Sequence, residues 1–245
     1  MTLQEVIEDV VAGNRILAQQ GVLDGFGHVS ARHPEDAGKF LLSRSLAPEL
    51  VTPADVMTFD LDSVAQGSNA GGDTRKPYLE RFIHGEIYKA RPEVMSIVHS
   101  HSPSVIPFAV SSVKLRPVYH MSGFLSGETE VFDIRAHFGC TDMLVRNGAH
   151  GAALAKELGA RGVVLMRGHG FVAVGESIPI AVYRAIYTEM NAALQQKAIA
   201  LGGEVTYLDV EEARLAEATN RSVVERPWQL WKTKAMGTSQ KYRST

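Results

Sequence analysis

Two histidines separated by one residue, His99 and His101, directly follow the short apolar run Ser96-Ile97-Val98. Alternate residues of an extended strand point to the same face, so the two imidazoles are predicted to lie close enough to bind one ion. Neutral imidazole nitrogens are ligands for zinc, iron, manganese and nickel. Taken alone, the pair also has a plainer interpretation, as two unrelated histidines at the end of a strand.

A third histidine, His169, follows the apolar run 162–166 and lies between Gly168 and Gly170. Flanking glycines allow a sharp turn and a close approach of the backbone to a site, and they are not typical of a core histidine. Glu80 is the candidate carboxylate, although an acid in the first turn of a helix also suits the helix dipole alone. Three imidazoles and one carboxylate would leave room for a substrate on the metal.

The elements that must position these residues alternate between helices and strands. Helical spacing of apolar residues predicts helices over 3–20, 79–90, 142–158 and 178–201, and another helix is expected to begin near Pro103. Short apolar or alternating runs predict strands at 40–42, 56–60, 96–98, 162–166 and 171–174. This order predicts an α/β layered domain with a central sheet. We find no linker composition, so residues 1–245 are expected to form a single domain with a mobile tail from about residue 232.

Composition excludes several function classes. The 245 residues carry 25 basic and 27 acidic side chains, a formal net charge of -2, and no basic patch that would indicate nucleic-acid binding. The one cysteine, Cys140, cannot form an internal disulfide. The sequence contains neither a signal-peptide pattern at its N-terminus nor a run of 18 apolar residues, so we expect a cytoplasmic protein without membrane contact.

Several separated motifs, in order and with matching gaps over roughly residues 5 to 210, resemble the class II aldolase/adducin family. They are Gly27-His28-Val29-Ser30, Pro77-Tyr78-Leu79-Glu80 with His84 and Tyr88, Arg91-Pro92, Val98-His99-Ser100-His101, and Gly168-His169-Gly170. The resemblance implies a three-layer α/β/α sandwich around a mostly antiparallel sheet, and a homotetramer with sites between subunits. It also implies one divalent metal ion per subunit, bound by His99, His101 and His169. Zinc or manganese is expected, and iron also suits such a site. Glu80 matches the family's acid/base glutamate, which also binds the metal in the resting site.

The chain departs from the family members that cleave phosphorylated sugars. Their phosphate-binding positions read Gly27-His28, Ser43-Arg44 and Tyr78-Leu79 here, and most of the donors that a phosphate dianion needs are missing. Arg44 instead offers a planar guanidinium for a carboxylate, and His28 adds a second donor. A solvated arginine at a strand end is the alternative for Arg44. The pattern resembles the branch that decarboxylates aromatic acids, which includes the hydroxypyridine dicarboxylate decarboxylase of vitamin B6 breakdown.

Family aldolases place a proton-donating tyrosine about twenty residues after the metal pair, and it reaches across the subunit interface. His120 falls at that spacing here, with Tyr119 as the candidate if the register shifts by one residue. A histidine can act as a general acid near neutral pH. The alternative is that His120 is an ordinary interface residue.

These residues together predict a metal-dependent carbon–carbon lyase. Its expected reaction is decarboxylation of a hydroxylated aromatic or heteroaromatic (di)carboxylic acid through a metal-stabilised enolate, with Arg44, His28, Ser43, Tyr78 and Tyr119 as substrate-binding candidates and Glu80 and His120 as catalytic candidates. An aldolase acting on a non-phosphorylated hydroxy-keto acid and a non-haem iron oxygenase remain alternatives. A non-catalytic adducin-like module is a third, which the complete ligand set disfavours.

Overall fold

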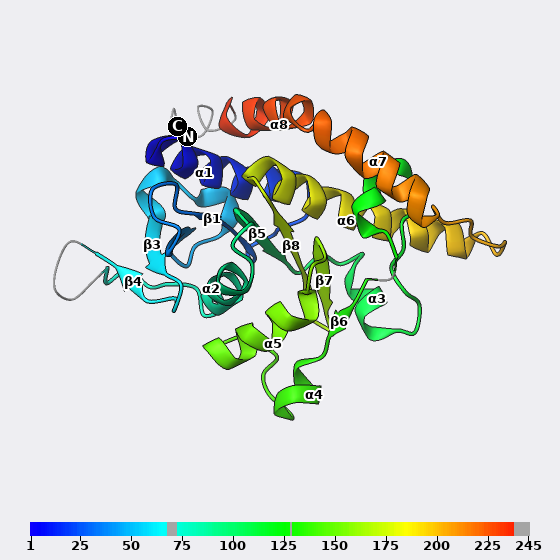
Figure 1. Ribbon diagram of the computed structural model, residues 1–245, viewed down its shortest axis with the longest axis horizontal. Coiled ribbons are helices and arrows are strands. Elements are labelled where there is room, and N and C mark those ends of the chain that lie inside the picture. Colours follow the sequence, from blue (N-terminus) through cyan, green and yellow to red (C-terminus); the bar gives the residue numbers. More distant parts are fainter. Residues whose placement is uncertain (68–72, 128, 238–245) are drawn as a thin grey trace.

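An eight-stranded sheet runs through the middle of the computed structural model, which describes residues 1–67, 73–127 and 129–237 (Figure 1). The strand order is β4-β3-β2-β1-β5-β8-β7-β6, and every neighbouring pair is antiparallel except β6 and β7. The strands are β1 His28–Arg32, β2 Lys39–Ser43, β3 Val56–Asp60, β4 Ala65–Gln66, β5 Ser96–Ser100, β6 Val131–Phe132, β7 Val163–Met166 and β8 Gly170–Gly175.

Helices cover both faces of the sheet and make the predicted three-layer α/β/α sandwich (Figure 1). One layer contains α1 Leu3–Gln19, α6 Ile178–Ala200, α7 Val210–Ser222 and α8 Glu225–Gly237, and the other contains α2 Arg81–Ala90 and α5 Gly148–Leu158. The short helices are α3 Ile106–Val110, α4 Ile134–Phe138, η1 Pro48–Leu50, η2 Pro53–Asp55 and η3 His120–Leu125. The fold class that the sequence predicted is therefore confirmed.

Strand β8 shows why the central strands read as continuous apolar runs. Phe171 and Ala173 face the α1/α6 layer, whereas Val172 and Val174 face the α2/α5 layer. All four side chains are completely buried because both faces of the sheet are covered. A strand in this position has no solvent face to carry alternating polar residues.

The C-terminal helix α8 packs along α1. Trp228 and Trp231 are buried against this layer, and the Lys232 ammonium lies 2.5 Å from the Asp9 carboxylate. Residues 232–237 of the predicted tail are therefore helix, while residues 238–245 lie outside the described part of the chain.

Several predicted boundaries differ from the observed ones. The helix predicted over 142–158 begins at Gly148, because the side chain of Asn147 caps it by accepting the backbone N–H of His150. The helix expected near Pro103 begins at Ile106. Among the described residues, no helix is both long and apolar enough to cross a membrane.

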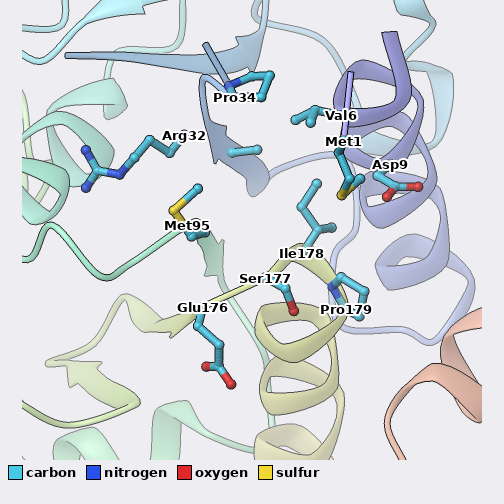
Figure 2. Close-up of a pocket in the computed structure, with 11 residues that line it drawn as sticks. Met1, Val6, Asp9, Arg32, Pro34, Met95, Glu176, Ser177, Ile178 and Pro179 are labelled. Carbon is cyan, nitrogen blue, oxygen red and sulfur yellow. The ribbon is translucent and has the colours of Figure 1, made fainter. Parts of the chain in front are cut away.

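A cavity of about 300 Å³ lies between the start of α1, the end of β1 and the start of α6 (Figure 2). Figure 2 shows the Arg32 guanidinium pointing away from Met1 and Ile178, and it donates instead to the carbonyl oxygens of Val94 and Tyr88. The cavity shares no lining residue with the histidine-rich cluster described next. It is lined by Met1, Val6, Asp9, Ala31, Arg32, Pro34, Met95, Glu176, Ser177, Ile178 and Pro179.

Candidate active site

Four side chains from three separate segments converge at one end of the central strands. His99 lies near the end of β5, His101 directly follows β5, His169 lies in the β7–β8 turn, and Glu80 precedes α2. The Nε2 atom of His101 is 3.2 Å from that of His99 and 3.0 Å from that of His169. Oε2 of Glu80 is 3.3 Å from His99 Nε2 and 3.4 Å from His169 Nε2. We call these four residues the ligand cluster.

The glycines around His169 bring the β7–β8 turn against the end of β5. Gly168 has a φ of +61°, a conformation that side chains with a Cβ rarely adopt. Gly170 passes so close to β5 that a Cβ at this position would collide with the carbonyl oxygen of Ser100. The Gly-His-Gly sequence is therefore a condition for placing His169 beside the histidine pair.

Backbone carbonyl groups orient two of the three imidazoles. Nδ1 of His99 lies 3.2 Å from the Phe171 carbonyl oxygen, and Nδ1 of His169 lies 3.1 Å from that of Met143. Each Nδ1–H donates to its carbonyl, so in the neutral rings the Nε2 lone pairs point into the cluster. Lone pairs that face one another at 3.0 to 3.2 Å repel unless a cation lies between them.

The donor set fits a divalent metal ion. Donor atoms bound tetrahedrally to one zinc ion at about 2.0–2.1 Å lie about 3.3 Å apart, and the four contacts within the cluster measure 3.0 to 3.4 Å. All four donor atoms lie within 4.8 Å of one another. Three imidazoles with one carboxylate suit zinc, manganese and iron.

The charge of Glu80 and the neutrality of His101 also favour cation binding. Burial opposes ionisation of Glu80, but the adjacent imidazoles of His99 and His169 outweigh it and hold the pKa of Glu80 well below its usual range. Burial, reinforced by the neighbouring histidines, lowers the pKa of His101 to about 4, so its ring is neutral near pH 7. Burial opposes protonation of His169, but the Glu80 carboxylate outweighs it and raises the pKa of His169, so a cation competes with a proton at that ring. Glu80 Oε1 also accepts the backbone N–H of Val145 at 3.0 Å. Glu80 is thus more than a first-turn acid placed for the helix dipole.

Four of the five predicted substrate-binding residues lie beside the cluster in a connected row, which we call the substrate-binding row: His28, Tyr78, Ser43 and Arg44. The ring of His28 is 5.3 Å from that of His99 and 4.5 Å from that of Tyr78, measured between centroids. The Tyr78 hydroxyl accepts from Ser43 Oγ at 3.3 Å and donates to the Leu46 carbonyl oxygen. Tyr78 therefore ties the segment that follows β2 to the histidines.

Arg44, next in this segment, is half-exposed and paired. Its Nε donates to Asp55 Oδ1 at 2.6 Å, and Asp55 is held in turn by the backbone N–H and the hydroxyl of Thr52. The terminal Nη groups of Arg44 have no hydrogen bond with any described residue. The guanidinium is thus fixed along one edge, and its other edge is open to a ligand.

His120 and Tyr119 lie elsewhere, at the start of η3. The His120 side chain is exposed, and its carbonyl oxygen accepts from Asn220 on α7 at 2.7 Å. The Tyr119 hydroxyl is buried and has no hydrogen-bond partner among the described residues. No hydrogen bond, ion pair or ring contact joins either side chain to the ligand cluster within the described parts of this chain.

Behind His28 lies a buried hydrogen-bonded row that was not predicted from the sequence. It contains His84, Ser30 and Tyr88, which were noted there only as members of the matching motifs. The available signal was the spacing. His28 and Ser30 alternate on a strand and His84 and Tyr88 are four apart on a helix, so each pair presents one face.

Comparisons with known proteins agree with this geometry. The family described as Class II Aldolase and Adducin N-terminal domain matches residues 8–196. Decarboxylase tropJ of Talaromyces stipitatus is 41% identical over 251 residues, which cover 92% of each chain. The 3,4-dihydroxyphthalate decarboxylase of a Terrabacter species is 32% identical over 81% of this chain and 83% of its own. The structure of L-fuculose 1-phosphate aldolase from Glaciozyma antarctica superimposes with a TM-score of 0.78 at 25% identity, over 98% of this chain and 91% of the other.

Proposed function

Because the chain belongs to the class II aldolase and adducin family, we propose that it is a metal-dependent lyase that decarboxylates a hydroxylated aromatic or heteroaromatic carboxylic acid. The observation that carries the proposal is the convergence of Glu80, His99, His101 and His169 on one point. Two relatives that this chain matches over most of their length are named decarboxylases. The cluster supports a metal-dependent lyase, and the relatives favour decarboxylation as its reaction.

Decarboxylation poses a problem that this donor set suits. When the bond between the ring carbon and the carboxylate breaks, carbon dioxide leaves and the electron pair stays on the ring carbon. That pair must be delocalised onto an oxygen and then captured by a proton. A divalent cation in the ligand cluster supplies a Lewis acid for the oxygen, worth several kcal/mol. Zinc or manganese is the proposed metal, with iron as the alternative.

The chain's own residues would bind the acid and move the proton. The open Nη edge of Arg44 suits a bidentate contact with a carboxylate, and His28, whose ring packs against Tyr78, offers a second polar contact. Glu80 already contacts both His99 and His169 and is ionised. As a carboxylate it would take the proton of the substrate's hydroxyl group, and Glu80 or His120 would then protonate the ring carbon.

We propose that His120, or Tyr119 beside it, serves the site of a neighbouring subunit in a homotetramer. Support comes from the exposure of His120 and from the absence of any contact between it and the ligand cluster within the described residues of its own chain. Size-exclusion chromatography with light scattering tests the assembly. A monomer that remains fully active would overturn this part of the proposal.

The central experiment measures carbon dioxide release from 3,4-dihydroxyphthalate. Protein loaded with zinc or manganese is expected to release carbon dioxide, to stop after chelation, and to recover when the metal is restored. L-Fuculose 1-phosphate, assayed in parallel, is expected to remain uncleaved because the chain lacks most phosphate donors. Metal-loaded protein that releases no carbon dioxide from this acid or from other hydroxylated aromatic acids would overturn the proposal.

Product analysis separates the alternative reactions. An aldolase acting on a hydroxy-keto acid, the second candidate given the fold shared with L-fuculose 1-phosphate aldolase, would yield an aldehyde and a keto acid. An iron oxygenase would consume oxygen with ferrous iron. A non-catalytic adducin-like module would purify without stoichiometric metal.

A further inference from the structure

Four buried polar side chains form one continuous row that starts beside the ligand cluster. His28 Nδ1 is 2.7 Å from His84 Nε2, His84 Nδ1 is 2.6 Å from Ser30 Oγ, and Ser30 Oγ is 2.8 Å from the Tyr88 hydroxyl. None of the four is more than 3% exposed. We call this row the His28 chain. Buried groups of this kind must satisfy their hydrogen bonds among themselves.

The Tyr88 end of the His28 chain determines which groups donate and which accept along it. The Tyr88 hydroxyl has one hydrogen-bond partner among the described residues, Ser30 Oγ, and Ser30 Oγ has only Tyr88 and His84. Both rings are buried and no carboxylate is hydrogen-bonded to either among the described residues, and a buried charge without a partner is costly, so both rings are neutral. A neutral imidazole has one N–H and one acceptor nitrogen, so a ring that accepts a hydrogen bond at one nitrogen donates one from the other.

Only one arrangement gives an acceptor to every hydrogen between Tyr88 and His28 Nδ1, and among the described residues it leaves its one unpaired N–H on His28 Nε2, at the end of the row beside the ligand cluster. Tyr88 donates to Ser30, Ser30 donates to His84 Nδ1, and the His84 Nε2–H donates to His28 Nδ1. In the reverse direction the hydroxyl hydrogen of Tyr88 has no acceptor among the described residues. If Tyr88 and His84 both donate to Ser30, the hydrogen of Ser30 has none. An unpaired buried donor carries its full desolvation penalty, so the first arrangement is favoured.

We propose that Tyr88, Ser30 and His84 are positioning residues that hold His28 with its proton on Nε2, so that His28 presents an N–H donor to a substrate oxygen beside the metal cluster. Tyr78 packs against the His28 ring, with centroids 4.5 Å apart. Nε2 of His28 has no hydrogen-bond partner among the described residues. His84 thus holds the ring in place through Nδ1, and the Nε2–H remains available to a substrate.

This assignment separates His28 from the metal ligands. A nitrogen that carries a proton cannot bind a metal, so His28 stays outside the ligand cluster although its ring is 5.3 Å from that of His99. It also narrows the substrate, because an N–H donor selects an oxygen that only accepts. Resting on the proposed function, the inference specifies a carboxylate or phenolate oxygen at the His28 position, rather than a hydroxyl group that must donate there.

Neutron diffraction from crystals of the purified protein exchanged into heavy water tests the tautomer directly. Deuterium is expected on Nε2 of both His28 and His84, and on the Ser30 hydroxyl directed at His84. Deuterium on His28 Nδ1 would overturn the proposal. The measurement needs no turnover, so its failure is distinct from a failure to decarboxylate.

Kinetics test what the tautomer does. Ser30→Ala interrupts the His28 chain and is expected to raise KM for 3,4-dihydroxyphthalate about tenfold, with metal content and kcat changed less than twofold. Tyr88→Phe is expected to change KM less, because Ser30 can still donate to His84. His28→Gln, which keeps an amide donor, should retain more affinity than His28→Glu, which offers only acceptors when ionised.

Ser96→Ala is the matched control for Ser30→Ala. Ser96 is an equally buried serine on the neighbouring strand, and its hydroxyl donates to the Ser30 carbonyl oxygen outside the His28 chain. Its KM is expected to stay near the wild-type value. Equal KM increases in both serine variants would show a packing effect and overturn the positioning role. If Ser30→Ala does not fold, the neutron result and the two His28 variants still test the proposed orientation of His28.

Discussion

The ligand cluster and the substrate-binding row lie side by side but are held in place in different ways. Each member of the cluster contacts at least one other member, and three are also held by backbone groups, His99 by Phe171, His169 by Met143 and Glu80 by Val145. The substrate-binding row contains the half-exposed Arg44, whose side chain has a hydrogen bond only with Asp55 among the described residues.

This difference separates metal binding from substrate binding. A cluster preorganised within one chain should bind its ion whatever substrate is present, because its donors pay little further ordering cost. The substrate-binding row has open donors whose geometry is completed only by a ligand. If the two regions are independent, variants should affect metal content or KM, and few should affect both.

Removing a ligand should have the largest effect. His101→Ala removes the imidazole whose Nε2 lies within 3.2 Å of those of the other two histidines. It is expected to abolish stoichiometric metal and to lower kcat/KM at least a thousandfold. His33→Ala, which changes a histidine on the β1–β2 connection, should leave metal content unchanged. Elemental analysis of both purified proteins is the measurement. Full metal occupancy in His101→Ala would contradict the ligand cluster.

Glu80→Gln should separate two functions within the cluster. The amide can still accept the Val145 N–H, so the local structure should hold. It cannot take up a proton, and general acid–base catalysis contributes roughly 10²–10⁴-fold. We expect kcat to fall by that factor while metal is lost less completely than in His101→Ala. A kcat within tenfold of wild type would show that Glu80 is a ligand only.

Much of this cluster could be predicted from the sequence because its members occur as short motifs at the ends of apolar strands. His99 and His101 follow one strand, and the glycines around His169 mark a close approach that the structure places against Ser100. The resemblance then joined Glu80 to the three histidines. The order of helical and strand-like segments predicted a layered α/β domain with a central sheet, and the resemblance implied its three-layer form.

Other features could not be read from local patterns. Strands β4 and β6 have two residues each, too few to show a period, and α7 carries few apolar residues to mark a buried face. The direction of the His28 chain depends on which atoms lack further partners, and that is a property of the packed interior. The pairing of Arg44 with Asp55 likewise depends on the 3₁₀ turn η2, where Thr52 holds the carboxylate.

Variants of His120 and Tyr119, which lie outside both regions, test whether a second chain contributes a residue to the active site. His120→Gln and Tyr119→Phe are expected to leave metal content unchanged, and the variant at the true proton donor should lose about a hundredfold in kcat. An inactive Glu80→Gln chain mixed with an inactive His120→Gln chain should then recover part of the activity, because some sites combine intact residues from both. No recovery after confirmed subunit exchange would place the proton donor within a single chain.

Substitution of Arg44 should have the smallest effect on activity, and it should change KM without changing metal content. A hydrogen bond to a charged group contributes roughly 1.5–3 kcal/mol, so Arg44→Ala should raise KM for a dicarboxylate about 10- to 100-fold. Lysine cannot reproduce the planar pair of donors, so Arg44→Lys should recover little. Asp55→Asn, which keeps the arginine but removes its charged partner, should change KM less. A parallel loss of metal in Arg44→Ala would show that the two regions are coupled, because no hydrogen bond or ion pair joins the Arg44 side chain to the ligand cluster in the described parts of the chain.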